Sequence, residues 1–193
     1  METMLSLFVG VGLAAACGFR IFVPLLVMSI ASLTGQIALA PEIEWIATYP
    51  ALAAFSLATL FEVAAYYIPW VDNLLDTIAI PAATVAGTIV MASAVSEMTP
   101  FLKWGLAVIV GGGVAGTVQG FTSIARLAST ATTGGLGNPA VSTVEAGGSV
   151  VLSILAITLP VVAVIAVVVI LFFASRKIYG WLSRRNKLQT QNE

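Results

Sequence analysis

Long apolar runs, continuous rather than alternating, constrain the fold of this chain more than any other feature. Of its 193 residues, 59% are hydrophobic and only 9% are charged, and the mean hydropathy is +1.03. A soluble domain carries about 25% charged residues, so we expect an integral membrane protein. Continuous runs are typical of helices, whereas the strands of a membrane barrel alternate. The sequence therefore predicts an all-α protein with one membrane domain over residues 1–175.

The apolar runs divide into about five predicted transmembrane segments, at residues 5–33, 46–68, 74–95, 100–126 and 150–173. The first is longer than the roughly 20 residues that a span needs, and Gly18, Arg20 and Pro24 interrupt it. We expect either two half-helices that meet near Arg20 or one tilted, kinked helix. Pro160 lies inside the last segment, whose later half is predicted to face lipid or a partner subunit.

The fourth segment changes within the span from apolar residues to glycine, small hydroxyls, an amide and a charge, so we expect it to be broken or kinked. Gly112, Gly116 and Gly120 recur at four-residue spacing, which lines one helix face and lets another backbone come close. Packing is the favoured interpretation of these glycines. Arg126 ends the run, and an ionisable group at membrane depth is a functional-site hypothesis; an arginine that reaches the interface is an equal alternative.

Three acidic residues lie in or near the second and third segments. Glu62 either bonds to a neighbouring helix, pairs with an intramembrane arginine or carries a proton. Asp72 and Asp76 share a helix face at a spacing of four residues and could hold a cation. We favour a helix cap, stabilised by the helix dipole, for Asp72 and leave the role of Asp76 open.

Residues 129–149 are rich in glycine and small hydroxyls, and Glu145 is their only charge. This composition suits irregular backbone that lines a wet cavity at membrane depth, and a flexible loop is the alternative. Ser142 and Glu145 have capping-box spacing for the last helix. The candidate substrate or ion site that these patterns predict comprises Arg20, Glu62, Asp76, Gly120, Thr122, Arg126, Thr132, Thr133 and Asn138.

A basic tail at residues 176–193 indicates the orientation of the chain. It holds Arg176, Lys177, Arg184, Arg185 and Lys187. By the positive-inside rule we expect a cytoplasmic C-terminus in the inner membrane, and five spans then place the N-terminus outside. The chain begins without the basic region of a secretory signal, so we expect Met1 onward to be mature protein.

Residues 10–19 and 112–121 share a pattern of glycines followed by phenylalanine, and an arginine follows each. Two spans lie between them, so the two members would run in opposite directions, in halves at 1–98 and 99–175. Inverted repeats with broken helices are typical of transporters.

Several motifs resemble a bacterial inner-membrane family known only as a domain of unknown function. They are Gly18-Phe19-Arg20, Pro69-Trp70-Val71-Asp72 with Asp76, and the run over residues 111–148. The resemblance covers roughly residues 5–175. It implies a multi-pass bacterial membrane protein and supplies no activity or ligand.

The chain has no histidine and only one cysteine, Cys17. This composition limits the kinds of catalytic and metal site that the chain can form. Histidine is the usual metal ligand and general base, and no acid spacing matches a metal or enzyme motif, so we expect no enzyme, metal or cofactor. A net charge of −1 gives no indication of nucleic-acid binding. We expect a small transporter or channel for an ion or small solute, in a homodimer or larger assembly. The alternative is a non-transporting membrane module that binds lipid or a partner membrane protein.

Overall fold

The computed structural model of the chain describes residues 2–95 and 98–190, and every element in this part is helical. The all-α prediction is therefore confirmed. In chain order the elements are α1 (Glu2–Cys17), α2 (Phe22–Leu33), the 3-10 helix η1 (Pro41–Ala47), α3 (Tyr49–Ala65), α4 (Pro69–Ala94), α5 (Pro100–Leu106), the π-helix η2 (Ala107–Gly112), α6 (Gly113–Thr133), α7 (Asn138–Thr158) and α8 (Pro160–Thr190).

The helices include enough long apolar segments for a multi-pass membrane protein. Four described stretches could cross a bilayer by length and composition: Leu74–Ala94, Pro100–Thr133, Asn138–Thr158 and Pro160–Lys177. The helices η1 and α3 are bent by 67° relative to each other, and they form a fifth candidate span if the pair is counted as one. The prediction of about five membrane helices is confirmed.

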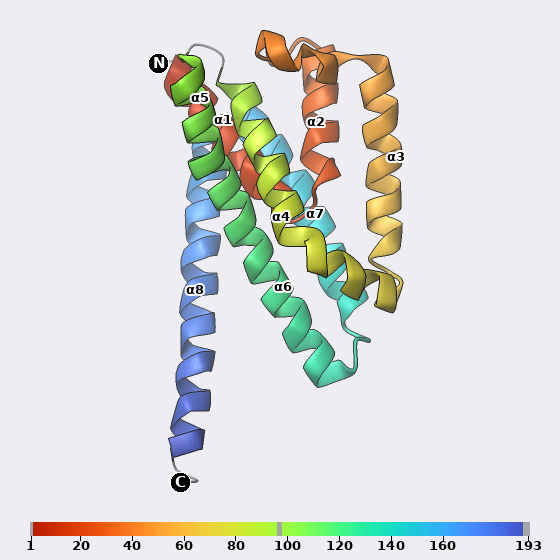
Figure 1. Cartoon of the computed structure of the whole chain (residues 1–193), viewed down its shortest axis with the longest axis vertical. Coiled ribbons are helices and arrows are strands. Elements are labelled where there is room, and N and C mark those ends of the chain that lie inside the picture. The colour runs from red at the N-terminus through yellow and green to blue at the C-terminus, as the bar shows by residue number, and fades with distance from the viewer. Residues whose placement is uncertain (1, 96–97, 191–193) are drawn as a thin grey trace.

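The first apolar segment forms a helical hairpin. Figure 1 shows α1 running inward from one end of the bundle and α2 returning to that same end. At about 1.5 Å per residue, α1 is about 24 Å long and α2 about 18 Å, and both are shorter than the roughly 30 Å hydrocarbon core. The chain turns between them at residues 18–21. These are the two half-helices that the sequence predicts near Arg20.

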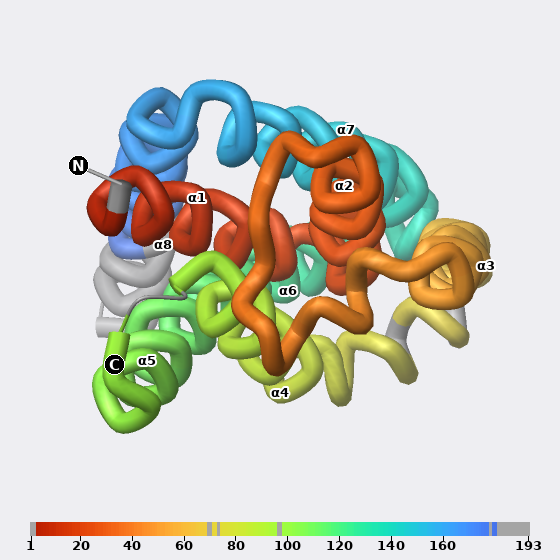
Figure 2. Tube along the Cα trace, turned by 90° about the horizontal axis from the view of Figure 1, so that it is seen from above, coloured from red at the N-terminus to blue at the C-terminus, as the bar shows by residue number. Residues whose placement is uncertain are grey.

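The inner end of α1 lies at the centre of the bundle. The helix packs against α4, α6, α7 and α8 (Figure 2). Residues 13–17 are completely buried, and three of these five are alanines, whose small side chains let neighbouring backbones come close. Beside α1, α2 packs against α3 and α7. The break at residues 18–21 is therefore held deep among other helices.

The fourth segment differs from the first because it stays helical throughout. The stretch Pro100–Thr133 is one long helical run that contains the π-helix η2. A Cβ added to Gly111 of η2 would lie 2.5 Å from the carbonyl oxygen of Gly87 on α4, and one on Gly116 would lie 2.7 Å from Thr84 Oγ1. Of the three glycines of the predicted face, Gly112 and Gly116 approach α4 closely, as the favoured packing interpretation predicts. A Cβ on Gly120 would meet nothing within 4 Å, so the interpretation does not hold there. The inverted repeat itself stays a prediction.

Two expectations for the C-terminal part are wrong. Residues 129–149 are not irregular backbone, because α6 continues to Thr133 and α7 begins at Asn138. The turn between them uses Gly134 and Gly135 at φ values of 65° and 91°, where glycine is the least strained residue. Small hydroxyls and glycines are poor helix formers in water, but between packed membrane helices their small size is an advantage.

The expected span at residues 150–173 is in fact two helices. Proline lacks the N–H that a helix interior needs, and Pro160 begins α8 while α7 ends at Thr158. The extra helix reverses the chain once more. Figure 1 shows α1 beginning at one end of the bundle and α8 ending at the other, and α8 extends through most of the predicted tail.

Candidate functional site: a charge centre at the helix break

Arg126 of α6 is enclosed by three carboxylates. Its side chain is almost fully buried, at 1% exposure. Nη1 donates to Asp72 Oδ1 at 2.6 Å and to Asp76 Oδ1 at 3.3 Å, both on α4. Nε donates to Glu145 Oε1 of α7 at 3.1 Å, and Nη2 donates to Oε2 of the same carboxylate. Every guanidinium nitrogen is therefore used, and the paired bonds to Glu145 are of the strong bidentate kind.

Asp72 connects this cluster to the start of α7. Its Oδ2 accepts a hydrogen bond from Asn138 Nδ2 at 2.9 Å, and the same amide donates to Thr130 Oγ1 at 3.0 Å. The expected capping role is wrong, because the N-cap residue of α4 is Ile68. Asp72 is completely buried in the first turn of α4, where the helix dipole still favours a negative charge.

Arg20 reaches the same cluster from the break between α1 and α2. It is 1% exposed. Nη2 donates to the backbone carbonyl of Ser142 at 3.0 Å and lies 3.4 Å from Glu145 Oε2. Glu145 thus bridges both arginines. We call Arg20, Asp72, Asp76, Arg126 and Glu145 the charge centre.

An aromatic ring completes the surroundings of the two arginines. The guanidinium carbons of Arg20 and Arg126 lie 3.9 and 4.0 Å from the centre of the Tyr66 ring. Tyr66 follows the end of α3 and is buried, so these cation–π contacts are shielded from solvent and correspondingly stronger. Sequence reasoning did not predict this role.

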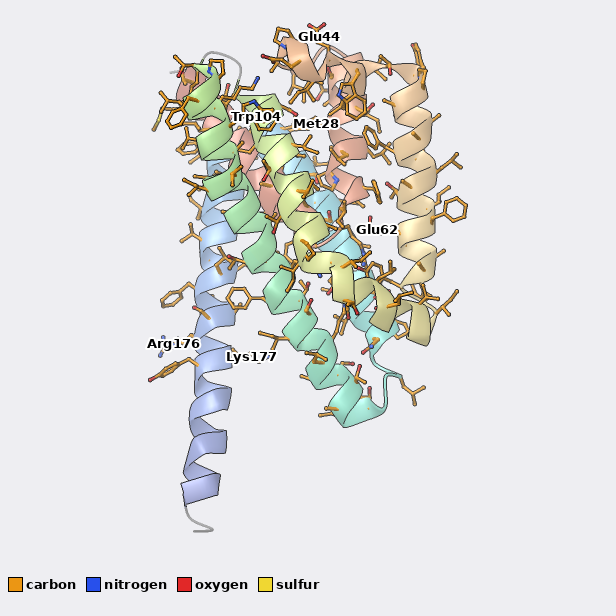
Figure 3. All side chains as sticks on the ribbon, viewed as in Figure 1. Met28, Glu44, Glu62, Trp104, Arg176 and Lys177 are labelled. Carbon is orange, nitrogen blue, oxygen red and sulfur yellow. The ribbon has the colours of Figure 1, made fainter. Side chains whose placement is uncertain are left out.

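Glu62 of α3 binds the backbone at the break rather than an arginine. Its Oε1 accepts from the Ile21 N–H at 2.7 Å and its Oε2 from the Phe22 N–H at 3.1 Å. The first amides of a helix have no partner within the helix, and a carboxylate there also complements the dipole. Glu62, which Figure 3 labels, therefore caps α2 from a neighbouring helix. This is the first of the three alternatives that the sequence left open.

The remaining candidate residues lie at varying distances from the centre. Thr122 is buried and donates to the Gln119 carbonyl at 3.0 Å. A Cβ on Gly120 would meet nothing within 4 Å. Thr132 and Thr133 are exposed near the end of α6 and bond to its own backbone. The structure thus brings together Arg20, Asp76, Arg126 and Asn138, and leaves Gly120, Thr132 and Thr133 outside the charge centre.

Two of the central carboxylates were not among the candidates. Glu145 is not part of a capping box, because α7 begins earlier, at Asn138, and Glu145 lies inside the helix. The available signal was that Glu145 is the only charge in residues 129–149. For Asp72 the signal was its spacing of four residues from Asp76, which places both on one face. Within the described residues, no group of three or more His, Cys, Asp or Glu side chains could hold a metal ion.

The same residues lie within a recognised family. Residues 7–179 match the family described as a domain of unknown function (DUF4126). The chain belongs to this family. No curated protein and no solved structure matches the chain. The family match spans the hairpin, every candidate span and the whole charge centre, so the site is part of the domain that defines this family.

Two cavities approach the centre of this DUF4126 domain from different sides. The first, about 730 Å³, lies among α1, α2 and the ends of α4 and α7, and its lining includes Leu13 and Met28. Met28 is labelled in Figure 3. The second, about 460 Å³, is a largely apolar groove between α6, α7 and α8, lined by Phe19, Phe121 and Glu145 among others. We call them the hairpin cavity and the apolar groove. The buried residues 14–17 of α1 lie in sequence between the linings of the two.

Proposed function

We propose that this protein is a small transporter or channel for an ion or small solute, with the charge centre as its binding site. The observation that carries the proposal is the burial of four ionisable side chains, Arg20, Asp72, Arg126 and Glu145, beside the partly exposed Asp76 in a helical membrane protein. Arg126 and Glu145 lie within candidate spans. Removing such groups from water is expensive, and apolar replacements of buried ion pairs are often as stable. Charges at this depth therefore favour a role in moving or binding a polar species.

The arrangement of the hairpin supports the same proposal. Half-helices that end at a central polar site are a recurring feature of transporters. Here the break lies at the charge centre, and the hairpin cavity and the apolar groove flank the buried last helical turn of α1, residues 14–17. Transport would require this turn to open toward one cavity at a time. Alternating exposure of Cys17, which is completely buried in this structure, would be its signature.

The second candidate is a module that binds lipid or a partner membrane protein without transport. Its supporting observation is the saturation of Arg126, whose three nitrogens all bond to carboxylates. An arginine that is fully paired can serve packing alone. The apolar groove and the exposed apolar side chains of α8, which include Val168, Phe172 and Phe173, would then contact lipid or protein.

We place the protein in the bacterial inner membrane with a cytoplasmic C-terminus, because the basic residues follow the last span. We also propose a homodimer, since the chain is small for a transporter and α8 exposes a long apolar face. A reporter fused to the C-terminus tests the orientation. The mass of the protein in mild detergent, corrected for the bound detergent, tests the dimer.

Flux into liposomes tests the transport proposal. Purified protein is reconstituted, and the uptake of protons, alkali cations and small anions is measured for the wild type, Arg20→Gln and Lys103→Gln. Lys103 is the matched control, because it is also a buried cation but pairs with Glu42 at 2.8 Å outside the charge centre. We expect flux of at least one solute, its loss in Arg20→Gln and its retention in Lys103→Gln. If liposomes that contain the wild-type protein take up none of these solutes, the result would support the second candidate.

A further inference from the structure

The guanidinium of Arg20 has hydrogen-bonding capacity that the protein does not use. A guanidinium carries five N–H donors. The Arg20 group makes one hydrogen bond, from Nη2 to the Ser142 carbonyl, and one longer contact with Glu145. Its Nε and Nη1 are buried and have no hydrogen-bond partner in the described structure. Buried donors without a partner are rare in folded proteins because they have lost water without compensation.

Two further buried side-chain atoms lack a hydrogen-bond partner. Within residues 2–95 and 98–190 they are Ser142 Oγ and Thr59 Oγ1. The carbonyl of Ser142 is the acceptor that holds Arg20. Thr59 lies three residues before Glu62 on α3, and residues at that spacing share a helix face. Since Glu62 caps α2 at the break, Thr59 shares the face of α3 that carries this cap.

The chemistry of these four atoms selects the class of ligand. Two are N–H groups of a permanent cation, and two are hydroxyls that can donate. A cluster of donors with positive charge recognises oxygen anions such as carboxylates and phosphates. A cation would find no new acceptor there other than the hydroxyl oxygens. The site is therefore built for an oxyanion.

The charge of the surroundings limits how negative that oxyanion can be. Glu145 is the acid nearest to Arg20, but its two oxygens are both bonded to Arg126. Arg20 is thus only partly neutralised. The charge centre and Glu62 at the break nevertheless contain four carboxylates and two arginines, so a ligand with two negative charges would be repelled more strongly than a ligand with one. A carboxylate or a phosphodiester fits better than sulfate.

We propose that Arg20 Nε and Nη1, with the hydroxyls of Ser142 and Thr59, bind a monovalent oxyanion at the break between α1 and α2. This inference rests on the proposed function and names the substrate class of the same site. The oxyanion can belong to a free solute or to a lipid headgroup. The apolar groove beside Phe19 and Glu145 is where the acyl chain of a lipid would lie.

Binding measurements on the full-length protein in maltoside micelles test the proposal. The water-soluble probes are acetate, dimethyl phosphate and sulfate, and the lipid probe is phosphatidylglycerol added to the micelles. Calorimetry follows binding to the wild type and to Ser142→Ala, Thr59→Val and Arg20→Gln. Ser153→Ala is the matched control, because Ser153 is also buried on α7 but its hydroxyl bonds to the Ser149 carbonyl.

We expect acetate or dimethyl phosphate to bind more tightly than sulfate, and Ser142→Ala and Thr59→Val each to weaken binding about tenfold, the loss of roughly one hydrogen bond. Ser153→Ala should bind as the wild type does. Binding of phosphatidylglycerol with the same variant pattern, but not of the soluble probes, assigns the site to a lipid headgroup. The inference is overturned if all variants bind the probes equally well, or if the wild type binds none of the probes.

The outcomes separate this inference from the proposed function. If liposomes show flux that depends on Arg20 but none of the oxyanions binds or competes, the oxyanion site is wrong and transport stands. If the oxyanions bind with the expected variant pattern but no solute moves, the site stands and the transport proposal fails. Because Ser142→Ala and Thr59→Val remove only unpartnered hydroxyls, loss of folding is not expected to obscure either result.

Discussion

Arg126 and Arg20 share Glu145 and the Tyr66 ring, yet the protein holds them in different ways. Arg126 donates four hydrogen bonds to three carboxylates. Arg20 donates one to a backbone carbonyl and leaves Nε and Nη1 without a partner. Both are equally buried. Burial therefore does not distinguish the two arginines, whereas the number of unused donors does.

The largest expected effect is the loss of stability in Arg126→Gln. Breaking a buried ion pair costs about 3–5 kcal/mol, because the partners are left uncompensated, and here three carboxylates lose their cation. Arg20→Gln should cost about 1.5–3 kcal/mol, the range for a hydrogen bond to a charged group. Thermal unfolding in detergent measures both. Equal losses would show that Arg20 is as structural as Arg126.

Double-mutant cycles with Glu145→Gln measure how strongly each arginine is coupled to Glu145. The coupling of Arg126 with Glu145 should lie near the upper end of the range of about 0.5–3 kcal/mol for residues in contact, because two hydrogen bonds join them. The coupling of Arg20 with Glu145 should lie near the lower end, since one contact of 3.4 Å joins them. A larger coupling for Arg20 would reverse the assignment.

A pair of glycine variants tests whether the backbone that carries Arg20 is itself firmly held. A Cβ on Gly18 would lie 2.6 Å from the carbonyl oxygen of Ala115 on α6, so Gly18→Ala should cost about 1–3 kcal/mol through overpacking. Gly120→Ala is the control, because a Cβ there meets nothing within 4 Å. It should be neutral or stabilise by up to about 1 kcal/mol. Thermal unfolding measures both variants. If Gly18→Ala does not lower the stability, the backbone at the break is loosely held.

The smallest expected effect comes from two serines on one face of α7. Ser149 donates to the Ala16 carbonyl at the end of α1, at 3.0 Å, so Ser149→Ala should lower the free energy of unfolding by about 1 kcal/mol. Ser142→Ala removes a hydroxyl without a partner and should leave stability unchanged or slightly higher when no ligand is present. Chemical denaturation in micelles resolves the pair. A clear loss in Ser142→Ala would mean that its hydroxyl is already satisfied.

The fold class and the helix break could be predicted from the sequence because both depend on local patterns. Apolar runs of sufficient length indicate helices in a bilayer, and Gly18 and Arg20 interrupt one of them. The error at α7 arose because small hydroxyls and glycines suggest a loop by their propensity in water, whereas contacts between helices decide the structure here.

The candidate site could be predicted only in part. Arg20 and Arg126 were visible because charges within apolar runs are rare and conspicuous. Their partners were not, because the pairing joins elements far apart in the chain. Arg20 contacts Ser142 across 122 positions, and no spacing in the sequence indicates which helices meet. Glu145 was assigned to a helix cap because its spacing from Ser142 fits a capping box, and the sequence does not show that α7 begins earlier.

The cap that Glu62 provides has a mechanical consequence. The carboxylate lies on α3, while the two amides that it satisfies belong to the first residues of α2. In the hydrocarbon interior no water can replace a bond that is pulled apart. Separating α3 from the hairpin would leave those amides without a partner, so we expect any motion of the hairpin to carry α3 with it.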